Sequence, residues 1–435
     1  MAQVPSSRVG HRFVRGDATG FDIPADPAAL IAAGPEWLTM AMHAFGSLSP
    51  GNRITAMTAQ PCPGGSTGKK LFLELATLRP EPGLDRVVFA KFSRDFDDER
   101  RDRQRDEMAG EARLVALSRN AEFPIRVPRG HFADYEAVSG TGIVITERIA
   151  FGENGIEPHR RKCLDWQTMP DPLEYYRATV TALARLAGAH KAGALGADID
   201  AQFPWDPAVG NADPIRISRE ELESQLEICR QFARDCPQLM PAHLADEAFL
   251  DRLCADALLV YGNEAALRQF LAADPDLIAL CHWNSNIDNA WFWREQGALQ
   301  CGLIDWGRAG QITFGAALWG GLCAAHHDVW TRHLDSLLAL FCEEYAAYGG
   351  PQVEVPRLRR HLFLHMALMG TSRMFAAPEV IRFRMPECIS ASGPRDAMFE
   401  PVSADPARNY TSVYTALLLA WEREDFGKLV REVLG

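Results

Sequence analysis

The spacing of apolar residues changes along the chain from helical to strand-like and back to helical. In PAALIAAGPEWLTMAMHAFG, Leu30, Leu38, Met42 and Phe45 recur at roughly helical spacing, and Pro35 is expected to divide the helix into two pieces. We therefore expect residues 1–45 to form a helical extension that packs on the body of the protein.

Alternation with a period of two begins after Gly51. The segments NRITAMTAQ, LFLELATL and DRVVFAKFS have this pattern, with a leucine at every second position from Leu71 to Leu75. A charged helix that contains Glu107 and Glu111 follows, and a short strand, TGIVITERI, ends the region. The pattern predicts a small antiparallel sheet with one helix over residues 46–150.

Helical spacing returns after residue 151. Several long segments carry apolar residues at i, i+3, i+4 and i+7: PLEYYRATVTALARLAGAHKAGALG, ISREELESQLEICRQFARDC, HHDVWTRHLDSLLALFCEEYAAYG and NYTSVYTALLLAWEREDFGKLVREVLG. Short strands are expected around Cys281–Trp293 and Gln300–Asp305. These patterns predict an α+β protein with a small sheet lobe and a large helical lobe, the second covering residues 151–435.

The net charge and the cysteine content indicate which kinds of partner and which cellular compartment to expect. The 435 residues carry a formal charge of −12, which argues against a nucleic-acid partner because phosphate backbones attract clustered lysine and arginine. The ten cysteines form no C-x-x-C pair, and the start, MAQVPSSRVGHRFVRGD, lacks the apolar segment of a signal peptide. We expect a cytoplasmic protein that spans no membrane, and its acidity favours a neutral or cationic partner over an anionic one.

A glycine-rich turn, PCPGGSTGKK, joins two of the predicted strands. It is not a P-loop, because that motif needs a glycine at Pro63 and a hydroxyl residue at Lys70, and it opens a helix and not a strand. Two interpretations stay open: a plain hairpin turn, or a flap whose backbone N–H groups cover phosphates. The candidate phosphate-binding residues of the flap are Gly64, Gly65, Ser66, Thr67 and Gly68.

Lys91 lies inside the apolar strand VVFAKF. A buried ammonium without a partner is costly, so the lysine is either an exposed residue of an edge strand or a paired one. In the second case Lys91 would hold nucleotide phosphates while a helix glutamate holds the lysine in place. Glu111 is the expected partner, with Glu107, one turn earlier, as the rival.

A second set of polar residues comes from the two later strands. CHWNSNIDN contains His282, Asn284, Asp288 and Asn289, and GLIDWGRAG contains Asp305. Mg²⁺ that bridges phosphates takes oxygen ligands, which Asn289 and Asp305 can supply. Each segment taken alone also fits a polar turn or a helix start.

In this order along the chain, the motifs resemble those of the aminoglycoside phosphotransferase and ecdysteroid-kinase-like family, small-molecule relatives of protein kinases. The resemblance covers about residues 52–326 and rests on VFAK, EARLVAL, ITERI, HWNSNIDN and IDWG. It implies a two-lobed protein-kinase-like fold, ATP and Mg²⁺ as cofactors, and a small-molecule acceptor. It also implies that the backbone from Glu147 to Ile149 meets the adenine.

The chain departs from the family at the catalytic loop. The family's catalytic aspartate, two residues after the histidine, is Asn284, and an amide cannot accept a proton from a hydroxyl. His282 is expected to brace the loop, and Asp288 is the candidate replacement base. The loop is also similar to that of selenoprotein O, which transfers AMP, at Asn286, Asp288 and Asn289.

The sequence therefore favours an ATP-dependent phosphotransferase that acts on a hydroxyl of a small molecule. Two alternatives remain. One is a nucleotide-binding pseudokinase, since Asn284 is a loss of chemistry, and the other is a nucleotidyl transferase that uses Asp288 as its base.

Overall fold

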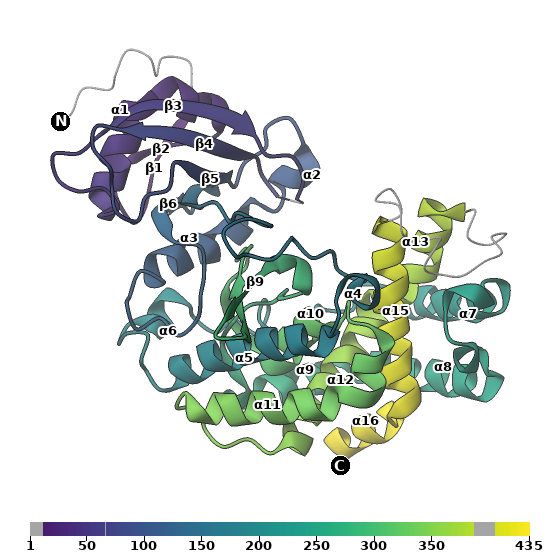
Figure 1. Ribbon diagram of the computed structural model, residues 1–435. Coiled ribbons are helices and arrows are strands. Elements are labelled where there is room, and N and C mark those ends of the chain that lie inside the picture. The colour runs from purple at the N-terminus through teal and green to yellow at the C-terminus, as the bar shows by residue number, and fades with distance from the viewer. Residues whose placement is uncertain (1–11, 66, 387–404) are drawn as a thin grey trace. The chain divides into compact units, whose positions relative to one another are not determined.

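The computed structural model describes residues 12–65, 67–386 and 405–435, and Figure 1 shows the course of the chain. Two compact units make up the structure. The first comprises the chain up to Glu157 together with Leu195–Phe203 and Gly302–Ala309, and the second comprises Pro158–Ala194, Pro204–Cys301 and Gly310–Gly435. The predicted α+β class is confirmed, because the first unit holds a five-stranded antiparallel sheet and the second is mainly helical.

The sheet of the first unit has the strand order β3-β4-β5-β7-β6. Its strands are β3 (Ile54–Pro61), β4 (Lys70–Thr77), β5 (Val87–Phe92), β6 (Gly130–Glu136) and β7 (Thr141–Glu147). A separate pair, β1 (Phe13–Arg15) and β2 (Asp22–Pro24), precedes it. The sequence predicted every strand of the large sheet except β6, whose segment GHFADYE mixes buried charged and polar residues with apolar ones.

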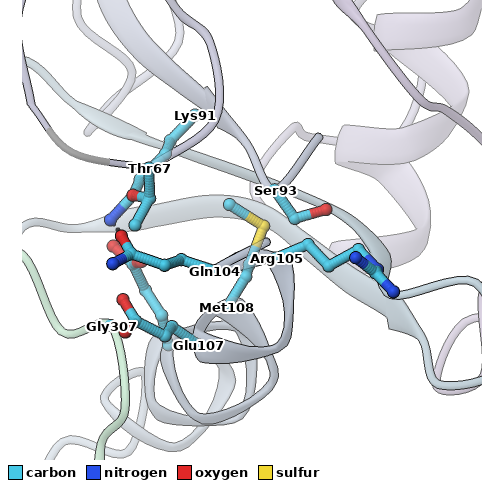
Figure 2. Close-up of a pocket in the computed structure, with 9 residues that line it drawn as sticks. Thr67, Lys91, Ser93, Gln104, Arg105, Glu107, Met108 and Gly307 are labelled. Carbon is cyan, nitrogen blue, oxygen red and sulfur yellow. Dashed lines mark hydrogen bonds and ion pairs between the residues drawn. The ribbon is translucent and has the colours of Figure 1, made fainter. Parts of the chain in front are cut away.

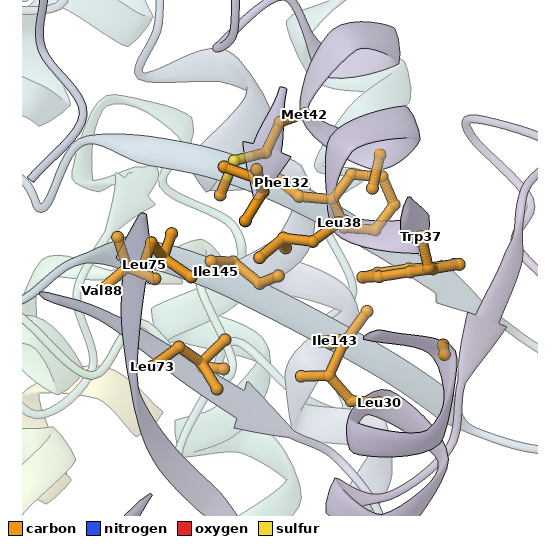
Figure 3. Packing of buried hydrophobic residues seen from close by; sticks show 14 of the residues in the cluster. Leu30, Trp37, Leu38, Met42, Leu73, Leu75, Val88, Phe132, Ile143 and Ile145 are labelled. Atoms are coloured by element: carbon orange, nitrogen blue, oxygen red, sulfur yellow. The ribbon is translucent and has the colours of Figure 1, made fainter. Parts of the chain in front are cut away.

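Two helices pack on opposite faces of this sheet. The core in Figure 3 is formed where Leu30, Trp37 and Leu38 of α1 (Pro27–Phe45) meet residues such as Ile143 and Ile145 of β7. Val144, the residue between those two isoleucines, packs instead with α3 (Met108–Leu117), since successive side chains of a strand point to opposite faces. The expected helical extension is thus built into the core of the first unit.

Helix α1 has a break where the sequence places a proline. Gly34 has φ 65° and ψ −164°, values outside the helical range, and Pro35 follows it. Proline disfavours a helical conformation in the residue before it, so the predicted division into two pieces is observed as a kink at Gly34. The short helices α2 (Glu99–Asp102) and α6 (Ile199–Gln202) complete the helices of the first unit.

The alternation of strand residues places Lys91 on the α3 face of the sheet. Lys91 in β5 lies directly opposite Val144 in β7 and opposite Lys70 in β4. Residues that oppose each other in an antiparallel pair share a face, so both lysines lie on the side that Val144 presents to α3. The leucines from Leu71 to Leu75 point to the other side, into the core against α1.

The second unit consists mainly of helices. They are α4 (Asp165–Thr168), α5 (Pro172–Lys191), α7 (Arg219–Asp235), α8 (Glu247–Gly262), α9 (Glu264–Ala272), α10 (Phe314–Leu322), α11 (Leu334–Ala347), α12 (Val355–Ser372), α13 (Ala377–Arg384), α15 (Asp405–Arg423) and α16 (Phe426–Leu434). A π-helical turn, Val329–His333, precedes α11. The segment predicted as one long helix at the end of the chain is two helices, because Asp425 caps a new helix by accepting a hydrogen bond from the Lys428 backbone N–H at 2.7 Å.

Short strands interrupt the helices. β8 (Ile278–Cys281) pairs with β11 (Gly310–Thr313) in the antiparallel direction. β9 (Ala290–Glu295) and β10 (Ala298–Leu303) form a second two-stranded sheet. The predicted strands around Cys281–Trp293 and Gln300–Asp305 correspond to β8, β9 and β10. No helix in the described part of the chain is both long and apolar enough to cross a bilayer.

Candidate functional site

Lys91 is buried and doubly paired in the first unit. Only 4% of the residue is exposed, and its Nζ lies 2.7 Å from Glu111 Oε2 and 2.6 Å from Asp305 Oδ1. Burial opposes the charge of the ammonium, but the two carboxylates more than offset it and raise the pKa of Lys91 above its usual value. Lys91 is therefore a charged group held between two acids and not an edge lysine in solvent.

Glu111, the expected partner, is the glutamate that contacts Lys91. It is 7% exposed, and burial raises the pKa of its carboxyl against the opposing effect of Lys91. Glu107 has another use in the structure, since its backbone carbonyl accepts a hydrogen bond from the Arg308 N–H at 2.8 Å. That bond ties the IDWG segment to the start of α3.

Asp305 is presented by a sharp turn of the chain. Asp305 and Arg308 both have a left-handed backbone, with φ of 61° and 63°, which is uncommon outside glycine and is concentrated at functional sites. The Trp306 indole N–H donates to the Leu303 carbonyl at 2.8 Å and stabilises the turn from within. Half of the Asp305 side chain, 51%, remains exposed, so a cation can reach its carboxylate.

The glycine turn lies between β3 and β4, beside the end of β5. Gly64, Gly65 and Gly68 all have positive φ, and the Arg101 guanidinium donates to the backbone carbonyls of Thr67 and Gly68. Ser66, the remaining candidate in this turn, lies outside the described residues. Arg101 thus anchors the end of the turn that leads into β4.

A small pocket opens between the turn, β5 and α3. Figure 2 shows its lining, which consists of Thr67, Lys91, Ser93, Gln104, Arg105, Glu107, Met108, Glu111 and Gly307. Thr67, Lys91 and Glu111 were expected at such a site from the sequence. Ser93, Gln104 and Arg105 were not, because their only sequence signal is their place in the segment between Lys91 and Glu111.

The segment expected to meet the adenine lies at the end of β7. Glu147 is the last residue of the strand, and both its backbone N–H and its carboxylate are bonded to Arg129, at 2.9 and 3.0 Å. Ile149 follows the strand and is half-buried. Neither residue lines the pocket in Figure 2.

The residues of HWNSNIDN form a loop between β8 and β9 of the second unit. His282 is 1% exposed, and its Nδ1 accepts a hydrogen bond from the Asn284 N–H at 3.0 Å. The Asn289 N–H donates to the Asn286 carbonyl at 2.8 Å. These bonds give the loop, which we call the 282–289 loop, a fixed course.

The asparagine side chains of this loop have defined orientations. Asn289 Nδ2 donates to the Asn284 carbonyl at 2.8 Å, so Oδ1 is the atom that Asn289 can offer to a cation. Asn286 Nδ2 donates to Asn284 Oδ1 at 2.5 Å, which leaves the NH₂ group of Asn284 for other contacts. Asn284 thus presents a hydrogen-bond donor at the position where the family has a proton acceptor.

Asp288 is held by residues of the segment that precedes α4. Lys162 Nζ lies 2.9 Å from Asp288 Oδ2, and His159 Nε2 lies 2.8 Å from the Asp288 carbonyl oxygen. Burial opposes the charge of Lys162, but Asp288 raises the pKa of this lysine above its usual value. Asp288 Oδ1 is buried and has no hydrogen-bond partner among the described residues. No sequence motif indicates the Lys162 contact, which joins positions far apart along the chain.

The 282–289 loop lies tightly against α10. A Cβ added at Gly320 would overlap the backbone carbonyl oxygen of Trp283, so only glycine permits this approach. Cys323, at the end of α10, has its Sγ 3.8 Å from the Asn286 amide. Helix α10 therefore supports the 282–289 loop.

Replacing Gly320 by alanine is expected to destabilise the second unit. The atom in the way belongs to the backbone, so the loop must move, and overpacking of this kind costs about 1–3 kcal/mol. Denaturant unfolding of the full chain measures the loss. Gly262→Ala at the end of α8 is the matched control, because nothing lies within 4 Å of a Cβ there. Equal stabilities of the two variants would contradict the close packing.

The first unit contains the features with which protein kinases hold nucleotide phosphates. A glycine-rich turn joins two strands, the next strand carries a lysine, and a glutamate of the following helix pairs with that lysine. No family model matches the sequence, and no curated protein is significantly similar to it in sequence.

Several solved structures are similar to the chain over most of its length. One is a choline/ethanolamine kinase family protein from Mesorhizobium loti, at 14% identity over 82% of this chain and 92% of that one, with a TM-score of 0.34. A microcompartment-associated aminopropanol kinase is 13% identical over 90% and 99%, with a TM-score of 0.38. An aminoglycoside-3′-phosphotransferase of type VIII is 19% identical over 71% and 93%, with a TM-score of 0.35.

Proposed function

We propose that the chain is an ATP- and Mg²⁺-dependent phosphotransferase that acts on a hydroxyl group of a small molecule. The observation that carries the proposal is the buried Lys91 ammonium, held by Glu111 and Asp305 beside the pocket under the glycine turn. A charged lysine fixed in this way is suited to bind phosphate oxygens, and its paired carboxylates keep it in place before the ligand arrives.

Two residues, one in each unit, carry oxygen atoms of the kind that a hard divalent cation takes as ligands. Asp305 offers a half-exposed carboxylate, and Asn289 offers the oxygen of an amide whose nitrogen is committed to its own loop. Mg²⁺ on a nucleotide is bound through one or two protein oxygens together with phosphates, so a larger cluster of protein ligands is not needed. When bound, Mg²⁺ neutralises charge on the phosphate groups.

In the proposed reaction, the acceptor hydroxyl oxygen forms a bond to the γ-phosphorus of ATP, the bond to the β-bridging oxygen breaks, and ADP leaves. The hydroxyl proton goes to Asp288, which Lys162 holds in place. Asn284 positions the acceptor through its NH₂ group. Positioning and charge neutralisation account for most of the rate in phosphoryl transfer, so a displaced base is compatible with activity.

Incubation with Mg²⁺ and ATP labelled at either the α- or the γ-phosphate tests the proposal, with a panel of amino alcohols, sugars and nucleosides as acceptors. Transfer of the γ-label to an acceptor is the expected result. Transfer of the α-label would instead identify a nucleotidyl transferase. Binding of ATP without transfer of either label would identify a pseudokinase, the alternative that the amide of Asn284 favours.

Asp288→Asn is expected to lower the rate of γ-phosphoryl transfer at least tenfold, because general-base contributions are typically about 10²–10⁴-fold. Asn284→Asp is expected to raise the rate, since it restores a carboxylate at the family's position. Initial rates at saturating ATP measure both effects. If Asn284→Asp lowers the rate while Asp288→Asn leaves it unchanged, Asp288 is not the base.

A further inference from the structure

A second lysine, Lys70, lies beside the glycine turn, and the proposed reaction gives it no role. Lys70 is the first residue of β4 and lies directly opposite Lys91 in β5. Cross-strand partners of an antiparallel pair have Cβ atoms about 4.5–5.5 Å apart on one face of the sheet. The two ammonium groups therefore extend from adjacent positions toward the same region.

The two lysines differ in how their charges are balanced. Lys91 has two carboxylates within ion-pair distance, whereas Lys70 has none among the described residues. Its Nζ makes one hydrogen bond, to the Gly64 carbonyl at 3.2 Å. Burial, and next the positive charge of Lys91, lower the pKa of Lys70. Like charges directly opposite each other in a sheet repel, and the two carboxylates at this place are bound to Lys91, so an anion that contacts Lys70 would relieve the repulsion.

The Lys70 ammonium also lies directly beneath the turn. A Cβ added at Gly65 would overlap Lys70 Nζ, so a side chain at position 65 and the lysine cannot both occupy this space. Gly65 has φ 78°, which other residues rarely adopt. Because position 65 is a glycine, the Lys70 ammonium can lie close to the backbone of the turn.

We propose that Lys70 is a second phosphate-binding lysine and that it contacts the polyphosphate of a nucleoside triphosphate together with Lys91. The inference rests on the proposed function. It adds Lys70 to the nucleotide-binding residues named there, which are those of the glycine turn, Lys91 and Asp305. A polyphosphate can supply negative charge to both ammonium groups, and it is the ligand chemistry that suits a lysine without a carboxylate at ion-pair distance beside a second lysine under a glycine turn. In the other interpretation, Lys70 only tethers the turn through the Gly64 carbonyl.

Binding of Mg²⁺·ATP and of adenosine to the full chain, measured by isothermal titration calorimetry, separates these interpretations. Lys70→Met is expected to weaken Mg²⁺·ATP binding at least tenfold and to leave adenosine binding unchanged, because adenosine has no phosphate. Lys70→Arg is expected to recover most of the affinity for Mg²⁺·ATP. Lys69→Met is the matched control, since the neighbouring Lys69 pairs with Asp95 at 3.7 Å and with Asp97, and it should change neither affinity more than twofold.

The outcomes distinguish this inference from the function on which it rests. If the wild-type chain binds Mg²⁺·ATP and Lys70→Met binds it equally well, the inference is wrong and the proposed function stands. A parallel loss of ATP and adenosine affinity in Lys70→Met would show that the lysine only tethers the turn. If the wild-type chain binds no Mg²⁺·ATP, the proposed function fails and the inference fails with it.

Discussion

Replacing Asp305 by alanine is expected to abolish the Mg²⁺-dependent part of ATP binding. The half-exposed carboxylate is the charged oxygen ligand proposed for the metal, and even partners outside the metal's first coordination sphere typically contribute about 10–100-fold to affinity. Titrations of ATP in the presence of Mg²⁺ and of EDTA should therefore differ for the wild-type chain and coincide for Asp305→Ala. An unchanged affinity for Mg²⁺·ATP in this variant would count decisively against the site.

A second carboxylate of the same unit provides the control. Asp97 is largely exposed and pairs with Lys69, so Asp97→Ala removes one negative charge near the glycine turn without touching Lys91. We expect this variant to bind Mg²⁺·ATP like the wild-type chain. A similar loss in both variants would mean that net charge, and not a metal ligand, determines the affinity.

Replacing Lys91 by methionine is expected to affect both stability and binding. Glu111 would remain 7% exposed next to Asp305 without a cation between them, and breaking a buried ion pair typically costs about 3–5 kcal/mol. We expect a loss of this size in the free energy of unfolding, measured with urea, together with loss of ATP binding. Unchanged stability would show that the two carboxylates find other partners.

Lys91→Arg separates the two effects, because it keeps the positive charge while changing its geometry. The guanidinium group of arginine is planar and larger than the ammonium group of lysine, so its N–H donors point in other directions. This variant should retain most of the stability of the wild-type chain and bind ATP more weakly. If Lys91→Met remains folded and binds ATP as well as the wild-type chain does, Lys91 is not the phosphate-binding lysine.

The sequence predicted the parts of the fold that depend on short-range patterns. The alternation from Leu71 to Leu75 identifies β4 and its core face, and the phase of VVFAKF puts Lys91 within a strand. The motif EARLVAL, and not a periodic pattern, favoured Glu111 over Glu107 as the partner of that lysine. The strand predictions succeed because the period of a strand fixes the directions of side chains locally.

Contacts that depend on strand register or on distant segments could not be predicted. Lys70 was noted only as the residue that fails the P-loop pattern, since nothing in the sequence shows that β4 and β5 align it with Lys91. Lys162 belongs to a charged segment with no periodic signal, and its contact with Asp288 follows from the tertiary fold. Such pairings are set by the packing of whole elements, which local propensity does not encode.

Two residues at the start of helix α3, one turn apart, position the charges around Lys91. The Glu111 side chain holds Lys91, while the carbonyl of Glu107, just before the first residue of the helix, holds Arg308 and with it the turn that presents Asp305. A tilt of this one element would therefore pull both carboxylates off the lysine at once. We therefore expect any displacement of α3 to disturb both ion pairs of Lys91 together, and not one without the other.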